Sequence, residues 1–277
     1  MVMQLAARPL DPLTYPGAMI SRLAAALVVI TLAVGCNGQQ SPAVPPTASP
    51  SSTPAEQSPP APSADPTAAG AGCLQPGDDG EQARFGQGGR LAGYLLGGGD
   101  RYVVLGHQSE GDSCEMLAIG RGLAAGGYHV LALDFSGYAA SREPATGNVL
   151  VSEDIVLAAT YVRARGAESV AVVGASMGGL AALVAGTKVE PPLDAVVSLS
   201  APDAFRGEEV PSLEGYPSPL QVYVGRDDID FVSSARAFAR EVPSAELFVL
   251  PVASHGVDLV DDEVLAQIMQ FLDRQAA

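Results

Sequence analysis

Residues 170–179 read Val-Ala-Val-Val-Gly-Ala-Ser-Met-Gly-Gly, and this stretch decides the fold. The apolar run from Val170 to Val173 is short and rich in β-branched residues, which predicts a buried strand. Glycines at 174 and 178 permit a tight turn from strand to helix, and such a turn exposes the hydroxyl of Ser176. The start of a helix also leaves backbone N–H groups free to bind a developing oxyanion. We therefore predict a strand, a sharp turn that carries a nucleophilic serine, and a helix of small residues over 180–186.

Strand-like and helix-like segments alternate on both sides of this turn. Nearly continuous apolar runs predict further buried strands at residues 102–105, 130–133, 195–199, 220–224 and 247–250. Apolar positions at helical spacing predict helices within residues 116–125, 155–162 and 260–272. Two runs, 81–85 and 91–96, flank Gly88-Gly89 and predict an antiparallel hairpin. The alternation predicts the α/β class, with a mostly parallel, doubly wound sheet that follows this N-terminal hairpin.

A serine hydroxyl is a weak nucleophile until a base accepts its proton, so a histidine is required. The chain has three histidines, His107, His129 and His255. His129 begins a predicted strand, and we interpret it as a strand-edge residue. His255 lies in a loop after the last predicted strand and completes the chain order serine, acid, histidine.

The third group must be a carboxylate that orients the imidazole. The segment Gly225-Arg226-Asp227-Asp228 follows the predicted strand 220–224, and Asp203 follows the preceding strand. With this segment, the chain resembles the α/β-hydrolase superfamily over roughly residues 81–273. In that superfamily the acid is commonly the Asp of Gly-x-x-Asp after this strand, which implies Asp228. Asp227 is the close competitor and Asp203 the distant one.

The resemblance also implies an oxyanion hole. The superfamily has a loop after its third strand, commonly His-Gly followed by a variable residue, and Gly106-His107-Gln108-Ser109 is similar to it. Because Gln108 stands where glycine is common, the backbone donor is either Ser109 or Gln108. The resemblance implies that Met177, the residue after the nucleophile, supplies the other backbone donor. His107 resembles the structural histidine of the superfamily.

Other kinds of site find little support in the sequence. A phosphate-binding turn is the alternative for residues 174–179, but Gly-Lys-Ser/Thr is absent and the Gly-x-Gly-x-x-Gly spacing is not met. The chain has no histidine pair and no Cys-x-x-Cys, so we expect no metal and no cofactor. The formal net charge of -16 argues against nucleic acid as a partner, because phosphates require a basic face.

The N-terminal part predicts export. Residues 23–34 are apolar or small, follow Arg22, and are too few to span a bilayer. The string Leu32-Ala33-Val34-Gly35-Cys36 resembles the lipobox of bacterial lipoproteins, with Ala33 where Leu is more usual. We therefore interpret 1–36 as a signal peptide, with Met19 as an alternative start and Cys36 as the lipidated residue. This implies a protein held on the outer face of a bacterial membrane.

Residues 37–72 separate this segment from the domain. Pro, Ser, Thr and Ala dominate them and no aromatic residue occurs, so we predict a disordered tether. The remaining 73–277, about 205 residues, fit one domain. With Cys36 assigned to lipid, Cys73 and Cys114 form an even pair in an oxidising compartment, which predicts a disulfide.

The expected function is cleavage of a carboxylic ester by Ser176, His255 and Asp228 through an acyl-enzyme, on a small-molecule acyl substrate. The connection between residues 200 and 219 is short, which predicts no large lid domain and an open site. A thioesterase or peptidase on the same three residues, or a non-catalytic binding lipoprotein with this fold, are the alternatives. We expect a monomer.

Overall fold

The structure of the protein is a computed structural model that describes residues 72–145, 147 and 150–276. The predicted signal peptide, its alternative start at Met19, the lipobox cysteine Cys36 and all but the last residue of the predicted tether lie outside the described residues. The division of the chain at residues 36 and 72 therefore stays a prediction. Every helix and strand of the described residues belongs to the unit that follows residue 59.

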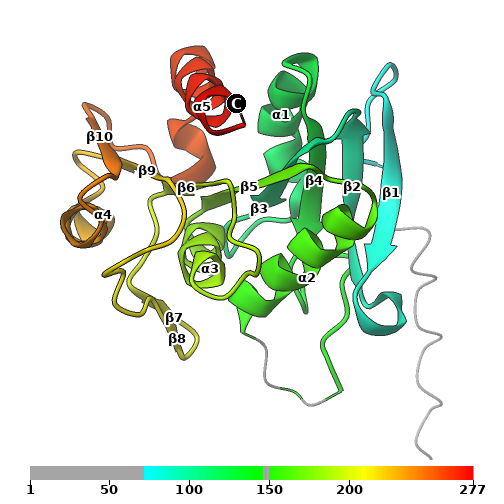
Figure 1. Cartoon of the computed structure of the whole chain (residues 1–277), viewed down its shortest axis with the longest axis horizontal. Helices are drawn as coiled ribbons and strands as arrows, with labels where there is room; N and C mark the ends of the chain where they lie inside the picture. Colours follow the sequence, from blue (N-terminus) through cyan, green and yellow to red (C-terminus); the bar gives the residue numbers. More distant parts are fainter. Residues whose placement is uncertain (1–71, 146, 148–149, 277) are drawn as a thin grey trace, which may run out of the picture. The chain divides into compact units, whose positions relative to one another are not determined.

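The core of the domain is an eight-stranded sheet in the order β1-β2-β4-β3-β5-β6-β9-β10 (Figure 1). The first two pairs of neighbours are antiparallel and the remaining pairs are parallel. The strands are β1 (Gly80–Phe85), β2 (Leu91–Gly97), β3 (Arg101–Gly106), β4 (His129–Asp134), β5 (Ser169–Ala175), β6 (Ala195–Leu199), β9 (Leu220–Gly225) and β10 (Glu246–Leu250). All six predicted parallel strands and the N-terminal hairpin are confirmed. The predicted burial is wrong for β10, which is half-buried because it lies at the edge of the sheet.

Helices cover both faces of this sheet, as a doubly wound fold requires (Figure 1). One apolar core joins the sheet to α2 (Val151–Ala164), α3 (Met177–Gly186) and α4 (Ile229–Glu241). The other core joins the opposite face to α1 (Ser113–Ala125) and α5 (Asp262–Gln275). Helix α4 was not predicted, although the buried positions Ala235 and Phe238 recur at helical spacing after Phe231.

The connection from β6 to β9 holds only a small hairpin, β7 (Ala204–Phe205) with β8 (Glu208–Glu209). The prediction of no large lid domain is therefore confirmed. Short 3-10 turns occur at Gln87–Gly89 and Gly256–Leu259. None of the helices in the described part of the chain is long and apolar enough to cross a membrane.

The start of the domain is fastened to α1. Cys73 and Cys114 form a disulfide with their Cα atoms 5.3 Å apart, which confirms the predicted pairing. Arg121 lies seven positions after Cys114 in α1. It forms an ion pair with Asp78 at 2.9 Å and donates a hydrogen bond to the Cys73 carbonyl. These contacts hold the first described residues beside the loop that follows β3.

The sheet order places two loops side by side. Strand β3 lies between β4 and β5, so the chain passes from β3 to β4 on one side of β3 and later forms β5 on the other side. Gly106 at the end of β3 is paired with Gly174 near the end of β5. The loop after β3 and the turn after β5 therefore meet at the carboxyl edge of the sheet, where open α/β sheets bind their ligands.

Candidate active site

Ser176 occupies the sharp turn between β5 and α3 that the sequence predicts. Its backbone adopts φ 50° and ψ −113°, a region that non-glycine residues rarely occupy and that costs on the order of 1–3 kcal/mol. The Ser176 N–H donates to the Leu199 carbonyl at 2.8 Å, which holds this conformation. The residue is 9% exposed.

The glycines of the motif are required by close approach of backbone segments. A Cβ atom at Gly174 would overlap the Gly178 carbonyl, and one at Gly178 would overlap the Gly106 carbonyl. The Gly178 N–H also donates to the His107 carbonyl at 3.1 Å. Helix α3 can therefore start directly against the loop after β3 only if both positions lack a side chain.

His255 and Asp228 come together from different loops. The Asp228 Oδ2 atom lies 2.9 Å from His255 Nδ1, and it also accepts a hydrogen bond from Ser200 Oγ at 2.8 Å. Asp228 is the residue before α4, and His255 follows β10. The Phe231 ring, in the first turn of α4, packs against the imidazole with ring centroids 4.3 Å apart. The carboxylate and the phenyl ring together orient the imidazole.

The competing residues do not reach this histidine. The side chain of Asp227 is 61% exposed and its Oδ1 atom lies 3.7 Å from Arg226 Nε. Asp203 is exposed in the connection after β6. His129 stacks on Tyr102 at the amino end of β4, the opposite edge of the sheet. The structure therefore brings Asp228, of the three candidate carboxylates, into contact with His255.

His107 is fully buried and holds the loop after β3. Its Nε2 atom accepts a hydrogen bond from the Phe135 N–H at 3.0 Å, so the ring proton is on Nδ1, which donates to the Gln108 carbonyl at 2.7 Å. Burial lowers the pKa of His107, which keeps the ring neutral. This arrangement suits a positioning residue and leaves no free nitrogen for base catalysis.

The two alternatives for the loop donor differ in their contacts. The Gln108 N–H donates to Glu115 Oε1 at 2.8 Å, so it is already engaged by a carboxylate of α1. Burial raises the pKa of this Glu115 carboxyl. Within the described residues, the N–H groups of Ser109 and Met177 have no hydrogen-bond partner. These contacts favour Ser109 over Gln108 as the loop donor.

Comparison with known proteins agrees with this architecture. Residues 102–230 match the sequence model of the alpha/beta hydrolase fold. An esterase of Pyrococcus furiosus has a TM-score of 0.62 at 19% identity, over 72% of this chain and 92% of that chain. The chain has the α/β-hydrolase fold. A dienelactone hydrolase of Anabaena variabilis shares this fold, with a TM-score of 0.56 at 20% identity, over 72% of this chain and 96% of that chain.

A relative at higher sequence identity is similar to part of this chain. A carboxylesterase of Bacillus subtilis is 31% identical over 119 residues, which are 42% of this chain and 48% of the carboxylesterase. The matching stretch therefore spans about half the length of that relative. Residues 72–145, 147 and 150–276 contain no cluster of three or more His, Cys, Asp or Glu side chains suited to a metal ion.

Sequence reasoning missed several residues of this site. Ser200, whose own φ is 48°, holds Asp228, and Phe231 packs on His255. Glu115 binds the loop after β3 from a helix that carried no functional signal. None of these roles has a short motif, because each depends on contacts between segments far apart in the sequence.

Proposed function

We propose that this protein is a serine hydrolase that cleaves carboxylic esters through an acyl-enzyme. The observation that carries the proposal is the 2.9 Å contact between Asp228 and His255 at the sheet edge where Ser176 occupies a strained turn. A carboxylate paired with Nδ1 keeps the proton of a neutral imidazole there and leaves Nε2 free as a base. The similarity to part of a carboxylesterase supports an ester as the substrate.

In this mechanism Ser176 Oγ attacks the ester carbonyl while His255 Nε2 accepts its proton. His255 then donates this proton to the departing alcohol, and a water molecule hydrolyses the acyl-enzyme by the same route. The N–H groups of Met177 and Ser109 stabilise the oxyanion, and loss of one such donor costs on the order of 10²-fold or more in rate. The short β6–β9 connection leaves the site accessible to small acyl esters.

Labelling with a fluorophosphonate probe tests the proposal. The wild-type protein is expected to be labelled, Ser176→Ala is not, and Ser233→Ala, which changes an exposed serine of α4, serves as the matched control. A folded wild-type protein that stays unlabelled contradicts the serine hydrolase. A panel of acyl esters, thioesters and peptides then separates an esterase from a thioesterase or a peptidase, and turnover of none of them favours the binding lipoprotein.

We also propose that Cys36 carries a lipid that holds the domain on the outer face of a bacterial membrane. The support is the lipobox-like sequence and the Cys73–Cys114 disulfide, because disulfides persist in oxidising compartments. Growth with an alkyne fatty acid should label the wild-type protein and leave Cys36→Ser unlabelled. Equal labelling of both contradicts the anchor.

A further inference from the structure

A cavity of about 210 Å³ opens between the loop after β4, the start of α2 and the β7–β8 hairpin. Its floor includes the buried Ser136 and Glu208, its walls are the half-buried rings of Tyr138 and Phe205, and Arg206 stands exposed at its rim. The Tyr138 ring packs edge-on against His107, 5.0 Å between centroids. Because His107 contacts the first turn of α3, the cavity adjoins the proposed oxyanion loop.

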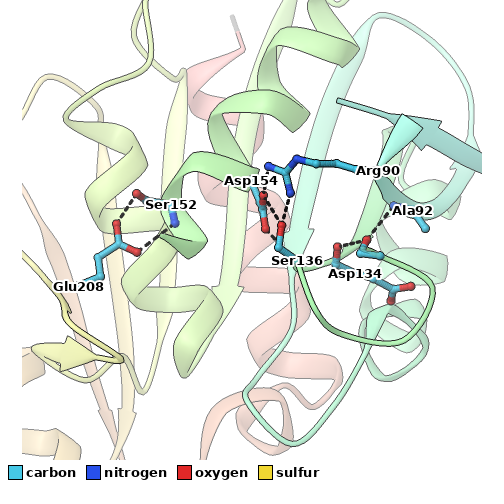
Figure 2. Close-up of polar contacts among 8 residues, drawn as sticks. Arg90, Ala92, Asp134, Ser136, Ser152, Asp154 and Glu208 are labelled. Atoms are coloured by element: carbon cyan, nitrogen blue, oxygen red, sulfur yellow. Dashed lines mark hydrogen bonds and ion pairs between the residues drawn. The ribbon is translucent and has the colours of Figure 1, made fainter. Parts of the chain in front are cut away.

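The polar groups of the cavity floor are already engaged in hydrogen bonds. Figure 2 shows Glu208 paired with both the hydroxyl and the N–H of Ser152. Lys188, the chain's single lysine, lies 3.7 Å from the same carboxylate. Ser136 donates to the buried Asp154 and accepts from Arg90, which also forms an ion pair with Asp154 at 2.9 Å (Figure 2). Each buried carboxylate thus has its own cation, and neither needs a ligand.

One charged hydrogen-bond donor at the cavity has no such partner. The Tyr138 hydroxyl also lacks a hydrogen-bond partner, but it has almost no accessible surface and does not reach a ligand in the cavity. Among the described residues the Arg206 guanidinium has neither an ion pair nor a hydrogen bond. It lies over the rings of Phe205 and Tyr138, at 5.3 and 5.6 Å from their centroids.

The backbone conformation of Arg206 is a second observation that points to a function for this side chain. Phe205 pairs with Glu208, so Arg206 and Gly207 form a two-residue hairpin turn, with φ 47° and 84°. This turn favours Asn, Asp or Gly at both positions, and arginine is strained there. Strained backbone conformations of this kind cluster at functional sites, and here the strained residue places a cation at the rim of a cavity.

We propose that this cavity is a subsite for a carboxylate group on the ester substrate, bound by the Arg206 guanidinium. The proposal rests on the proposed function, because it names the esters that the enzyme prefers. A guanidinium presents paired donors that match the two oxygens of a carboxylate. The acceptor that the Arg206 guanidinium lacks is what such a group supplies.

Opposing charges limit the strength of this subsite. Glu143 is exposed at the rim, and the whole chain carries a net charge of -16. The distant charges are screened beyond about 10 Å in 0.1 M salt, whereas a guanidinium in direct contact is not. We therefore expect a carboxylate to raise kcat/KM on the order of 10-fold over a neutral group of the same shape.

Matched esters and their carboxamides test the subsite. Ethyl hydrogen glutarate is compared with ethyl glutaramate, and γ-acetoxybutyrate with γ-acetoxybutyramide, so that the carboxylate lies on the acyl or on the alcohol side. In one pair the wild type is expected to prefer the carboxylate, and Arg206→Gln to abolish this preference. Arg236→Gln, which removes an exposed cation of α4, should keep the preference. Glu143→Gln should strengthen it.

Arg206→Asn separates the subsite from folding, because asparagine suits this turn. We expect its melting temperature to equal or exceed that of the wild type while the carboxylate preference is lost. The subsite is refuted if the wild type treats carboxylate and carboxamide alike in both pairs, or if the preference survives both Arg206 variants.

A failure of the proposed function gives a different result. Turnover of the carboxamide esters without a carboxylate preference refutes the subsite alone. If no ester is turned over and the fluorophosphonate probe does not react, the hydrolase is refuted, and calorimetric titration with glutarate then decides the subsite. Binding that Arg206→Gln weakens supports it, and the absence of binding overturns it.

Discussion

Replacement of Asp228 by asparagine tests the central contact of the site. The change keeps the shape of the side chain but removes its charge beside His255, where the two groups lie 2.9 Å apart and their side chains are 11% and 32% exposed. With about 4 Å between charge centres and an effective dielectric of about 20, the carboxylate stabilises an imidazolium by roughly 4 kcal/mol. This corresponds to about three decades in kcat, and a wrong imidazole tautomer would bring the loss to roughly 10⁴-fold.

The assay compares kcat and KM on a small ester, together with the rate of fluorophosphonate labelling. Asp227→Asn is the matched control, because it makes the same change one residue earlier on a carboxylate that is 61% exposed and does not contact the histidine. We expect less than a two-fold effect for the control. A loss below 10-fold for Asp228→Asn, or an equal loss for both variants, would refute the assignment of Asp228.

Three further predictions concern the elements around the site. Replacing Cys73 and Cys114 by serine removes the crosslink between residues 41 positions apart. The free energy of unfolding is expected to fall by about 4 kcal/mol and Tm by roughly 8–16 °C. A Tm shift below about 2 °C in thermal denaturation contradicts this. Because burial lowers the pKa of His107, the unfolded chain binds a proton below about pH 6.5 that the folded chain rejects, so stability falls on acidification by up to about 1.4 kcal/mol per pH unit. When urea denaturation is measured from pH 7 to 5.5, the free energy of unfolding should depend less steeply on pH for His107→Gln than for the wild type. An unchanged pH dependence argues against a neutral buried ring. Glu115→Ala removes the acceptor of the Gln108 N–H and should lower kcat about 10-fold with little change in KM, whereas a rise in KM alone contradicts a role in holding the oxyanion loop.

Most of the fold could be predicted from the sequence because its signals are local. A short, nearly continuous apolar run predicts a strand whatever its neighbours are, and all six such runs form strands of the sheet. Glycines at 174 and 178 predict the turn, since only a residue without a side chain tolerates the backbone contacts there. Helix α4 was missed because its apolar signal is weak, since only two of its buried residues, Ala235 and Phe238, are apolar.

For the site, the sequence and the tertiary structure determine different things. The sequence by itself determined the types of residue and the loops in which they lie, namely Ser176, His255 and a short acidic segment. Only the tertiary structure decided that Asp228 rather than Asp227 contacts His255, and that the Gln108 N–H is occupied while that of Ser109 is not. Adjacent carboxylates have the same chemistry in a sequence, and they differ only in the direction that a turn gives each side chain. The sheet alone brings together loops that are separated along the chain, so their contacts at its carboxyl edge are a property of the fold.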